Sequence, residues 1–62
     1  MKKYIIKDNN SSRITGKQVF LKADKSQTLN FDYAHIYPEV EAINIKEHDD
    51  NMELIEVNVV VV

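Results

Sequence analysis

Cysteine and tryptophan are absent from this 62-residue sequence, and glycine and proline each occur once. Without cysteine, neither a disulfide nor a thiolate metal site can stabilise the chain. A single glycine is too few for a glycine-rich phosphate-binding loop. The longest apolar run, the valines at 59–62, is far shorter than the roughly 20 residues of a membrane span. The opening residues lack the apolar stretch of a secretory signal peptide, so we expect no membrane association and a cytoplasmic location.

The apolar residues that are present favour β-strands. Of the 27 apolar residues, 14 are isoleucine or valine, whose branched side chains suit a pleated sheet. This number suffices for one small core, and we expect a single domain over residues 1–62. A chain of this length buries only about 60% of its unfolded surface, so it is marginally stable alone.

Charge is divided between two parts of the chain. Residues 1–25 carry seven basic and two acidic side chains, a net charge of +5. Residues 26–62 carry one basic and eight acidic side chains, a net charge of −7, and the sum is −2. Such a division indicates either one basic and one acidic face or charges that neutralise each other across neighbouring strands.

Two strands are predicted at the start of the chain. Tyr4, Ile5 and Ile6 predict a short strand over residues 3–7, followed by a polar turn at residues 8–12. Alternation of apolar and polar residues predicts a second strand over residues 13–23, paired with the first as a hairpin. Gly16 is expected to form a bulge or bend in that second strand.

The middle of the chain is expected to hold a turn and a packed segment. Residues 24–28 are polar and predict a turn, in which Asp24 can cap one helical turn. Leu29, Phe31 and Tyr33 then alternate with the polar residues Asn30 and Asp32. Residues 34–37 include bulky apolar side chains, which we expect to be packed.

A helix is predicted over residues 38–48. Pro38 suits the first position of a helix, and glutamates follow it in the first turn. Lys46 and His48 fall in the last turn, where cations suit the helix dipole. The alternative is a strand over residues 43–47, because Ile43 and Ile45 alternate with polar residues. The predicted fold class is α+β, a small antiparallel sheet with one helix packed on one face in roughly ββαβ order. The alternative fold is all-β.

The last segment, residues 52–62, is predicted to be a strand. Its odd-numbered residues from Ile55 onward fall on one face, which we expect the helix to cover. Val60 and Val62 fall on the opposite face, where an uncovered valine strand invites aggregation. We therefore expect Val60 and Val62 to mediate self-association, as a homodimer, unless neighbouring strands cover them. The expected core consists of Ile5, Val19, Leu21, Ile36, Ile43, Ile55 and Val57.

Short segments spread over most of the chain carry a resemblance to a known group of proteins. They are Tyr4-Ile5-Ile6-Lys7, Ala34-His35-Ile36-Tyr37-Pro38-Glu39-Val40-Glu41-Ala42 and Leu54-Ile55-Glu56-Val57. In this order they resemble small prophage- and phage-encoded proteins of Gram-positive bacteria. The resemblance implies a ββαβ domain, usually without an assigned function, and supplies no catalytic residues.

No group of residues predicts catalysis, a metal site or a cofactor site. His48, Asp49 and Asp50 are adjacent, and adjacent residues rarely converge on one metal ion. His35 has no acidic partner fixed nearby in the sequence, so we expect a structural role for it. The serines lie in polar turns outside any nucleophile motif. We therefore expect a protein that is not an enzyme and has no cofactor.

Two binding surfaces from different classes follow from the charge division. The first is an acidic surface for a protein partner, on the predicted helix and its exit: Glu39, Glu41, Glu47, Asp49 and Asp50. Such a surface attracts a basic partner, for example a host protein modulated by a phage-derived factor, although ordinary helix faces are also charged.

The second is a surface for single-stranded nucleic acid on the predicted N-terminal hairpin: Lys2, Lys3, Lys7, Arg13, Lys17 and Lys22. Tyr4 and Phe20 lie between these basic residues and would stack on bases. The acidic net charge makes nucleic acid the less favoured partner. In the opposing interpretation both rings point inward and the lysines protect sheet edges.

Overall fold

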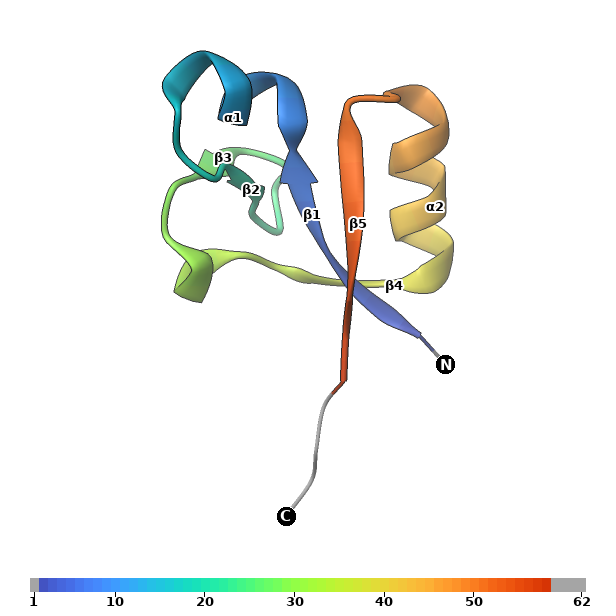
Figure 1. Cartoon of the computed structure of the whole chain (residues 1–62). Helices are drawn as coiled ribbons and strands as arrows, with labels where there is room; N and C mark the ends of the chain where they lie inside the picture. Colours follow the sequence, from blue (N-terminus) through green and yellow to red (C-terminus); the bar gives the residue numbers. More distant parts are fainter. Residues whose placement is uncertain (1, 59–62) are drawn as a thin grey trace.

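The computed structural model describes residues 2–58. In chain order, its elements are β1 (Lys3–Asp8), α1 (Asn9–Thr15), β2 (Phe20–Leu21), β3 (Gln27–Thr28), the 3₁₀ helix η1 (Phe31–Tyr33), β4 (Ile36–Pro38), α2 (Glu39–His48) and β5 (Met52–Val57). The strands form one curled antiparallel sheet, and α2 lies beside the β1–β5 pair (Figure 1). The predicted α+β class is confirmed.

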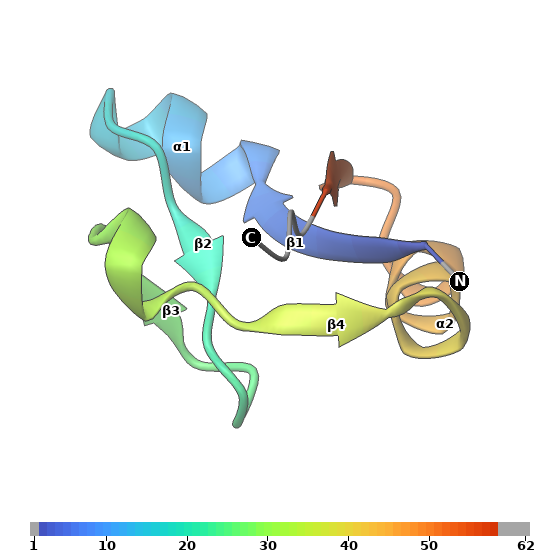
Figure 2. The same cartoon turned by 90° about the horizontal axis from the view of Figure 1, so that it is seen from below.

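Strand β1 is the centre of the sheet. One edge of β1 pairs with the whole of β5, from Lys3 opposite Val57 to Asp8 opposite Met52. The other edge pairs with β4 through residues 3–5 and with β2 at Lys7, opposite Phe20. In the view from below, β1 runs between β5 and β4 (Figure 2). Strands β2, β4 and β5 therefore all pair with residues of β1, Lys3–Asp8.

The core lies between the sheet and α2. Ile6 is fully buried, and it packs with Leu21, Tyr37 and Ala42. Partly buried side chains complete this cluster: Tyr4, Ile45, Met52 and Leu54. Because side chains alternate along a strand, the even-numbered residues of β1 and β5 face α2, and the odd-numbered residues face away.

Helix α2 confirms the predicted helix, and the all-β alternative is wrong. Pro38 lies at the N-cap position with an extended backbone, and the first turn carries two glutamates. Ala42 is buried against the sheet, where its small side chain permits close packing. Near the end of the helix, the Lys46 Nζ donates to the carbonyl oxygens of Asp50 (3.1 Å) and Met52 (2.7 Å). These bonds connect α2 to the turn before β5 and to the first residue of β5.

Helix α1 replaces most of the predicted polar turn and the first three residues of the predicted second strand. The Asp8 carboxylate accepts a bond from the Ser11 backbone N–H at 3.0 Å, which caps the helix start. Gly16 ends the helix in the left-handed conformation, with φ of 71°. The strand predicted over residues 13–23 is therefore wrong except at β2, and Gly16 is a helix cap rather than a bulge.

The segment between β2 and β4 contains a turn, the short strand β3 and a 3₁₀ helix. The turn before β3 is present, with the Asp24 carboxylate accepting from the Ser26 backbone N–H at 3.0 Å. Phe31 and Tyr33, however, belong to η1, because the Asn30 side chain accepts from the Asp32 N–H and starts a 3₁₀ turn. The alternation of apolar and polar residues over 29–33 therefore does not correspond to a strand.

The two faces of β5 are inverted relative to the prediction. Met52 and Leu54 pack against the α2-covered cluster, whereas Ile55 and Val57 lie on the opposite face and are half-buried. Of the predicted core, Ile5, Val19 and Leu21 are buried, but Ile36 and Ile43 are 43% and 42% exposed. The predicted core also omitted four buried residues: Ile6 and Ala42, both 0% exposed, and Phe20 and Tyr37, both 3% exposed. The predictions for Val59, Val60, Val61 and Val62 lie outside the described residues.

Candidate functional site

The outer face of α2 carries two exposed apolar side chains. Val40 is 77% exposed and Ile43 is 42% exposed. They lie outward because Ala42 and Ile45 occupy the side of the helix that packs on the sheet. A shallow hollow of about 440 Å³ is lined by Val40, Glu41, Ile43, Asn44 and Glu47. We call these five residues the α2 outer face.

The α2 outer face combines an apolar centre with carboxylates. Positions 40, 43, 44 and 47 are three or four residues apart and therefore share one side of a helix. Glu41 and Glu47 border the two apolar side chains. An exposed apolar patch with a polar border is typical of surfaces that contact other proteins. Sequence reasoning missed this centre because it assigned Ile43 to the core.

The predicted acidic residues are divided between this face and the end of the helix. Of the five, the structure brings only Glu41 and Glu47 to the α2 outer face. Glu39 is half-buried in the first turn. Asp49 caps the helix end, and its carboxylate accepts from the Asn51 backbone N–H at 3.0 Å. Asp50 is exposed in the following turn.

The predicted basic surface is not formed as expected. Lys3 and Lys7 lie on β1, Arg13 lies on α1, and Lys17 lies in the loop after α1, so these residues do not share a hairpin. Lys2 precedes β1 and Lys22 follows β2. The two aromatic residues expected to stack on bases are directed elsewhere: Phe20 is 3% exposed, with its ring edge-on to Phe31 at 5.5 Å, and Tyr4 packs against the core cluster.

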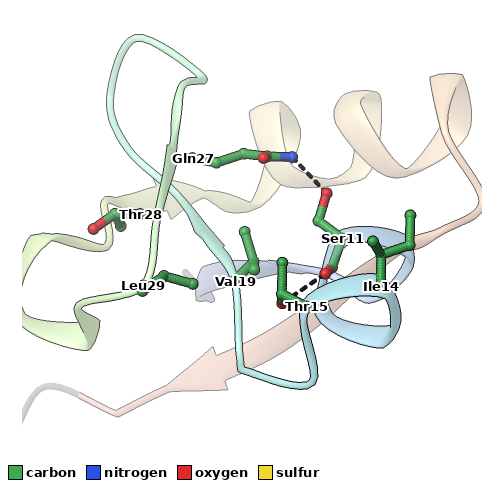
Figure 3. A pocket seen from close by; sticks show the side chains of 7 residues that line it. All are labelled: Ser11, Ile14, Thr15, Val19, Gln27, Thr28 and Leu29. Carbon is green, nitrogen blue, oxygen red and sulfur yellow. Dashed lines mark hydrogen bonds between the residues drawn. The ribbon is translucent and has the colours of Figure 1, made fainter.

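A second hollow lies between α1 and β3. Its volume is about 290 Å³, and Figure 3 shows its lining: Ser11, Ile14, Thr15, Val19, Gln27, Thr28 and Leu29. Ile14 is 77% exposed and Leu29 is 55% exposed, whereas Val19 is buried. Gln27 Nε2 donates to Ser11 Oγ at 2.8 Å, and Thr15 Oγ1 donates to the Ser11 carbonyl at 2.8 Å. Several polar groups of the lining are therefore bonded to one another.

A third hollow, of about 260 Å³, lies between α2 and the β2–β3 turn. It is lined by Ala23, Lys25, His35, Tyr37, Glu41, Asn44 and Ile45. The His35 ring stands edge-on to the Tyr37 ring, with centroids 4.6 Å apart. The Tyr37 hydroxyl donates to the carbonyl oxygen of Lys22. Burial raises the pKa of Tyr37 above its usual value, and the charges of Asp24 and Glu41 add to this effect.

The titratable groups of the described chain do not converge on one point. Among residues 2–58, no three His, Asp or Glu side chains are placed to hold a metal ion. His48 Nδ1 contacts the Asn44 carbonyl oxygen at 2.7 Å within α2. Hydrogen bonds from the Ser26 hydroxyl and backbone N–H lower the pKa of Asp24, which lies in an exposed turn. These contacts stabilise local structure.

Comparisons with known proteins find nothing similar to this chain. No family model, curated protein or solved structure matches it. Within residues 2–58, no helix combines the length and the apolar character needed to cross a membrane.

Proposed function

We propose that this chain is a non-enzymatic protein-binding module that contacts its partner through the α2 outer face. The observation that carries the proposal is the exposure of Val40 and Ile43 between Glu41 and Glu47. Water contact with two branched apolar side chains is unfavourable, and a partner that covers them would remove that cost.

The borders of this face indicate the chemistry of the partner. Glu41 and Glu47 flank the apolar centre, and Asp50 extends the negative charge past the helix end. A complementary surface would carry a small apolar group surrounded by lysine or arginine side chains. Charges at such a border mainly accelerate association and select the partner, while burial of the apolar centre slows dissociation.

The wider setting of the proposal comes from the resemblance to phage-encoded proteins. On that basis the partner is a host protein in the cytoplasm, and the chain modulates it by occupying a basic surface. The nucleic-acid alternative has less support, because Phe20 is buried and Tyr4 packs against the core.

Site-specific photo-cross-linking tests the proposed face. A photoreactive phenylalanine derivative at position 40 is expected to yield a discrete adduct when irradiated in a lysate of the organism that encodes the chain. The same group at Lys17, which is exposed in the loop after α1, is the matched control. Adducts of equal pattern at both positions would contradict the proposal.

The adduct must also depend on the chemistry of the face. Ile43→Asp in the position-40 protein should remove the adduct, because it places a charge in the apolar centre. The double variant Glu41→Gln/Glu47→Gln should give less adduct. Its adduct yield should also depend less on salt concentration. Glu53→Gln on β5 is the control for loss of charge alone. Melting curves for each variant establish that the fold is retained.

A further inference from the structure

Strand β5 has one edge that no strand in residues 2–58 occupies. It pairs with β1 along all six of its residues and with no other strand of the described sheet. Helix α2 packs against both β1 and β5 (Figure 1), and its Lys46 side chain reaches the Met52 carbonyl oxygen at the start of β5. A strand edge of this length presents backbone donors and acceptors that pair readily with another strand.

Three hydrogen bonds establish which residues of β5 direct their backbone groups toward that edge. The Asn9 N–H donates to the Asn51 carbonyl oxygen at 2.9 Å, so the odd-numbered positions bond toward β1. The Met52 carbonyl oxygen instead accepts from Lys46 Nζ, and the Met52 N–H donates to the Asp49 carbonyl oxygen at 3.1 Å. By strand alternation, the backbone groups of Leu54 and Glu56 also turn away from β1. Met52 is satisfied within the chain, which leaves Leu54 and Glu56 at the edge.

We infer that this edge binds a second copy of the chain, with the two β5 strands antiparallel about a two-fold axis at Ile55. In this register Leu54 of each copy pairs with Glu56 of the other. The edge-directed N–H and carbonyl groups of Leu54 and Glu56 would therefore form hydrogen bonds between the two copies. The bond from Lys46 to Met52 is preserved. A symmetric dimer requires such self-complementarity, because the same surface contributes from both copies.

The two neighbouring registers, with the axis at Leu54 or at Glu56, are less favourable. An axis at Leu54 would pair Glu56 with Met52, whose backbone groups are already bonded. An axis at Glu56 would place two glutamates directly opposite each other, which is destabilising. The axis at Ile55 avoids both costs.

The same register also joins two apolar rows. On the face of the sheet away from α2, Ile36, Ile5 and Ile55 lie side by side across β4, β1 and β5. Ile55 is half-buried in the single chain, and its outer neighbour would be Ile55 of the second copy. Cross-strand pairs of branched side chains stabilise a sheet, so the dimer would continue the row across six strands. This surface is separate from the α2 outer face, and the inference does not depend on the proposed function.

Disulfide trapping tests the register directly, because the native chain has no cysteine. At the axis, the two residues at position 55 would form a pair without backbone bonds between them, with Cα atoms about 4.5 Å apart. That distance suits a disulfide, so Ile55→Cys should form a covalent dimer as its main product under mild oxidation. Val57→Cys, also half-buried on the same face, is the matched control. Position 57 would lie four residues from its counterpart, about 13 Å along the strand, and should stay mainly monomeric.

A proline variant tests the edge without a thiol. Glu56→Pro removes an N–H that points away from β1, so pairing with β1 is retained while one bond of the dimer is lost. Sedimentation should show a lower dimer fraction for Glu56→Pro than for Glu56→Thr, which keeps the N–H and removes the same charge. Circular dichroism checks that both variants fold.

Three results would overturn the inference. The first is equal cross-linking of the Ile55→Cys and Val57→Cys proteins, which indicates random collision or stacking of sheet faces. The second is absence of cross-linking in both. The third is a native chain that sediments as a monomer at the highest attainable concentration, which leaves the edge to a strand from a different protein.

Discussion

The hydroxyl of Tyr37 donates a hydrogen bond to the backbone carbonyl of Lys22, and this bond ties β4 to the segment after β2. The ring of Tyr37 is only 3% exposed and packs in the main core cluster. One side chain thus contributes both apolar burial and a bond between segments fifteen residues apart.

Alkaline pH should destabilise the fold through Tyr37. Burial, with the nearby charges of Asp24 and Glu41, raises its folded-state pKa above the unfolded value of 10.0. As pH rises past 10.0, the Tyr37 hydroxyl loses its proton in the unfolded chain before it does so in the folded chain. The contribution of Tyr37 to stability is therefore complete below pH 10.0 and is lost as pH rises through the folded-state pKa. Urea titrations across this range should show stability falling as pH rises.

Tyr37→Phe separates this effect from general alkaline unfolding. The variant should be less stable than the native chain by about 0.5–1.5 kcal/mol at neutral pH, because one hydrogen bond is lost. Above pH 10 its stability should decline less steeply. Tyr33→Phe, at a residue that is 68% exposed, is the control. Parallel pH profiles for the native chain and Tyr37→Phe would contradict the assignment.

Truncations of Ile6 and Ile43 should differ strongly in effect. Ile6→Ala should cost about 2–5 kcal/mol, since it opens a cavity beneath α2 at a fully buried position. Ile43→Ala should cost less than about 1 kcal/mol, because its side chain is 42% exposed. Denaturant unfolding measures both, and equal losses would show that the core is wrongly placed.

Asp8 should stabilise the junction between β1 and α1. It is 7% exposed, and its carboxylate accepts from the Ser11 N–H and from Gln27 Nε2, the latter at 2.8 Å. Asp8→Ala should lower the free energy of unfolding by about 1–2 kcal/mol through loss of the cap. Asp32→Ala, at an exposed position, is the control. A double-mutant cycle with Gln27→Ala should give a coupling energy above zero, and strict additivity would contradict the contact.

Gly16 should resist substitution for conformational reasons alone. A Cβ at this position would meet no atom within 4 Å, so steric crowding is not the cause. Its φ of 71° is a backbone conformation that residues with a Cβ adopt only with strain. Gly16→Ala should therefore lower the free energy of unfolding by about 1 kcal/mol. Gly16→Asn should cost less, because asparagine tolerates the left-handed region better. Thermal melts that rank asparagine below alanine would contradict this account.

The sequence contained enough information to predict α2, but not to predict α1. Pro38, the early glutamates and Lys46 all agree on the helix, and the structure follows them. The residues after Asp8 are asparagine and serine, which are poor helix formers, so tertiary contacts override local preference there. The available indication was the pair of caps, Asp8 and Gly16, placed one short helix apart.

Alternation identifies two faces of a strand without showing which one is covered. In β5 both faces are apolar, with Met52 and Leu54 on one and Ile55 and Val57 on the other. Pairing with β1 determines which face of β5 is covered. Leu54 lies opposite Ile6, the residue beneath the helix, so the face of Met52 and Leu54 is the covered one. The apolar centre of the α2 outer face was missed for the same reason, since sequence alone does not orient the helix.

The pairing of β1 with β5 affects how the chain matures on the ribosome. Strand β1 is synthesised early, yet its longest partner is the last strand of the described sheet. Until residues 52–57 emerge from the exit tunnel, β1 has one vacant edge and Ile6 lacks part of its cover. Pairing between distant segments is slow to form and leaves the nascent chain open to aggregation. The β1–β5 pair therefore forms only after residues 52–57 have left the tunnel, about fifty residues after β1 itself.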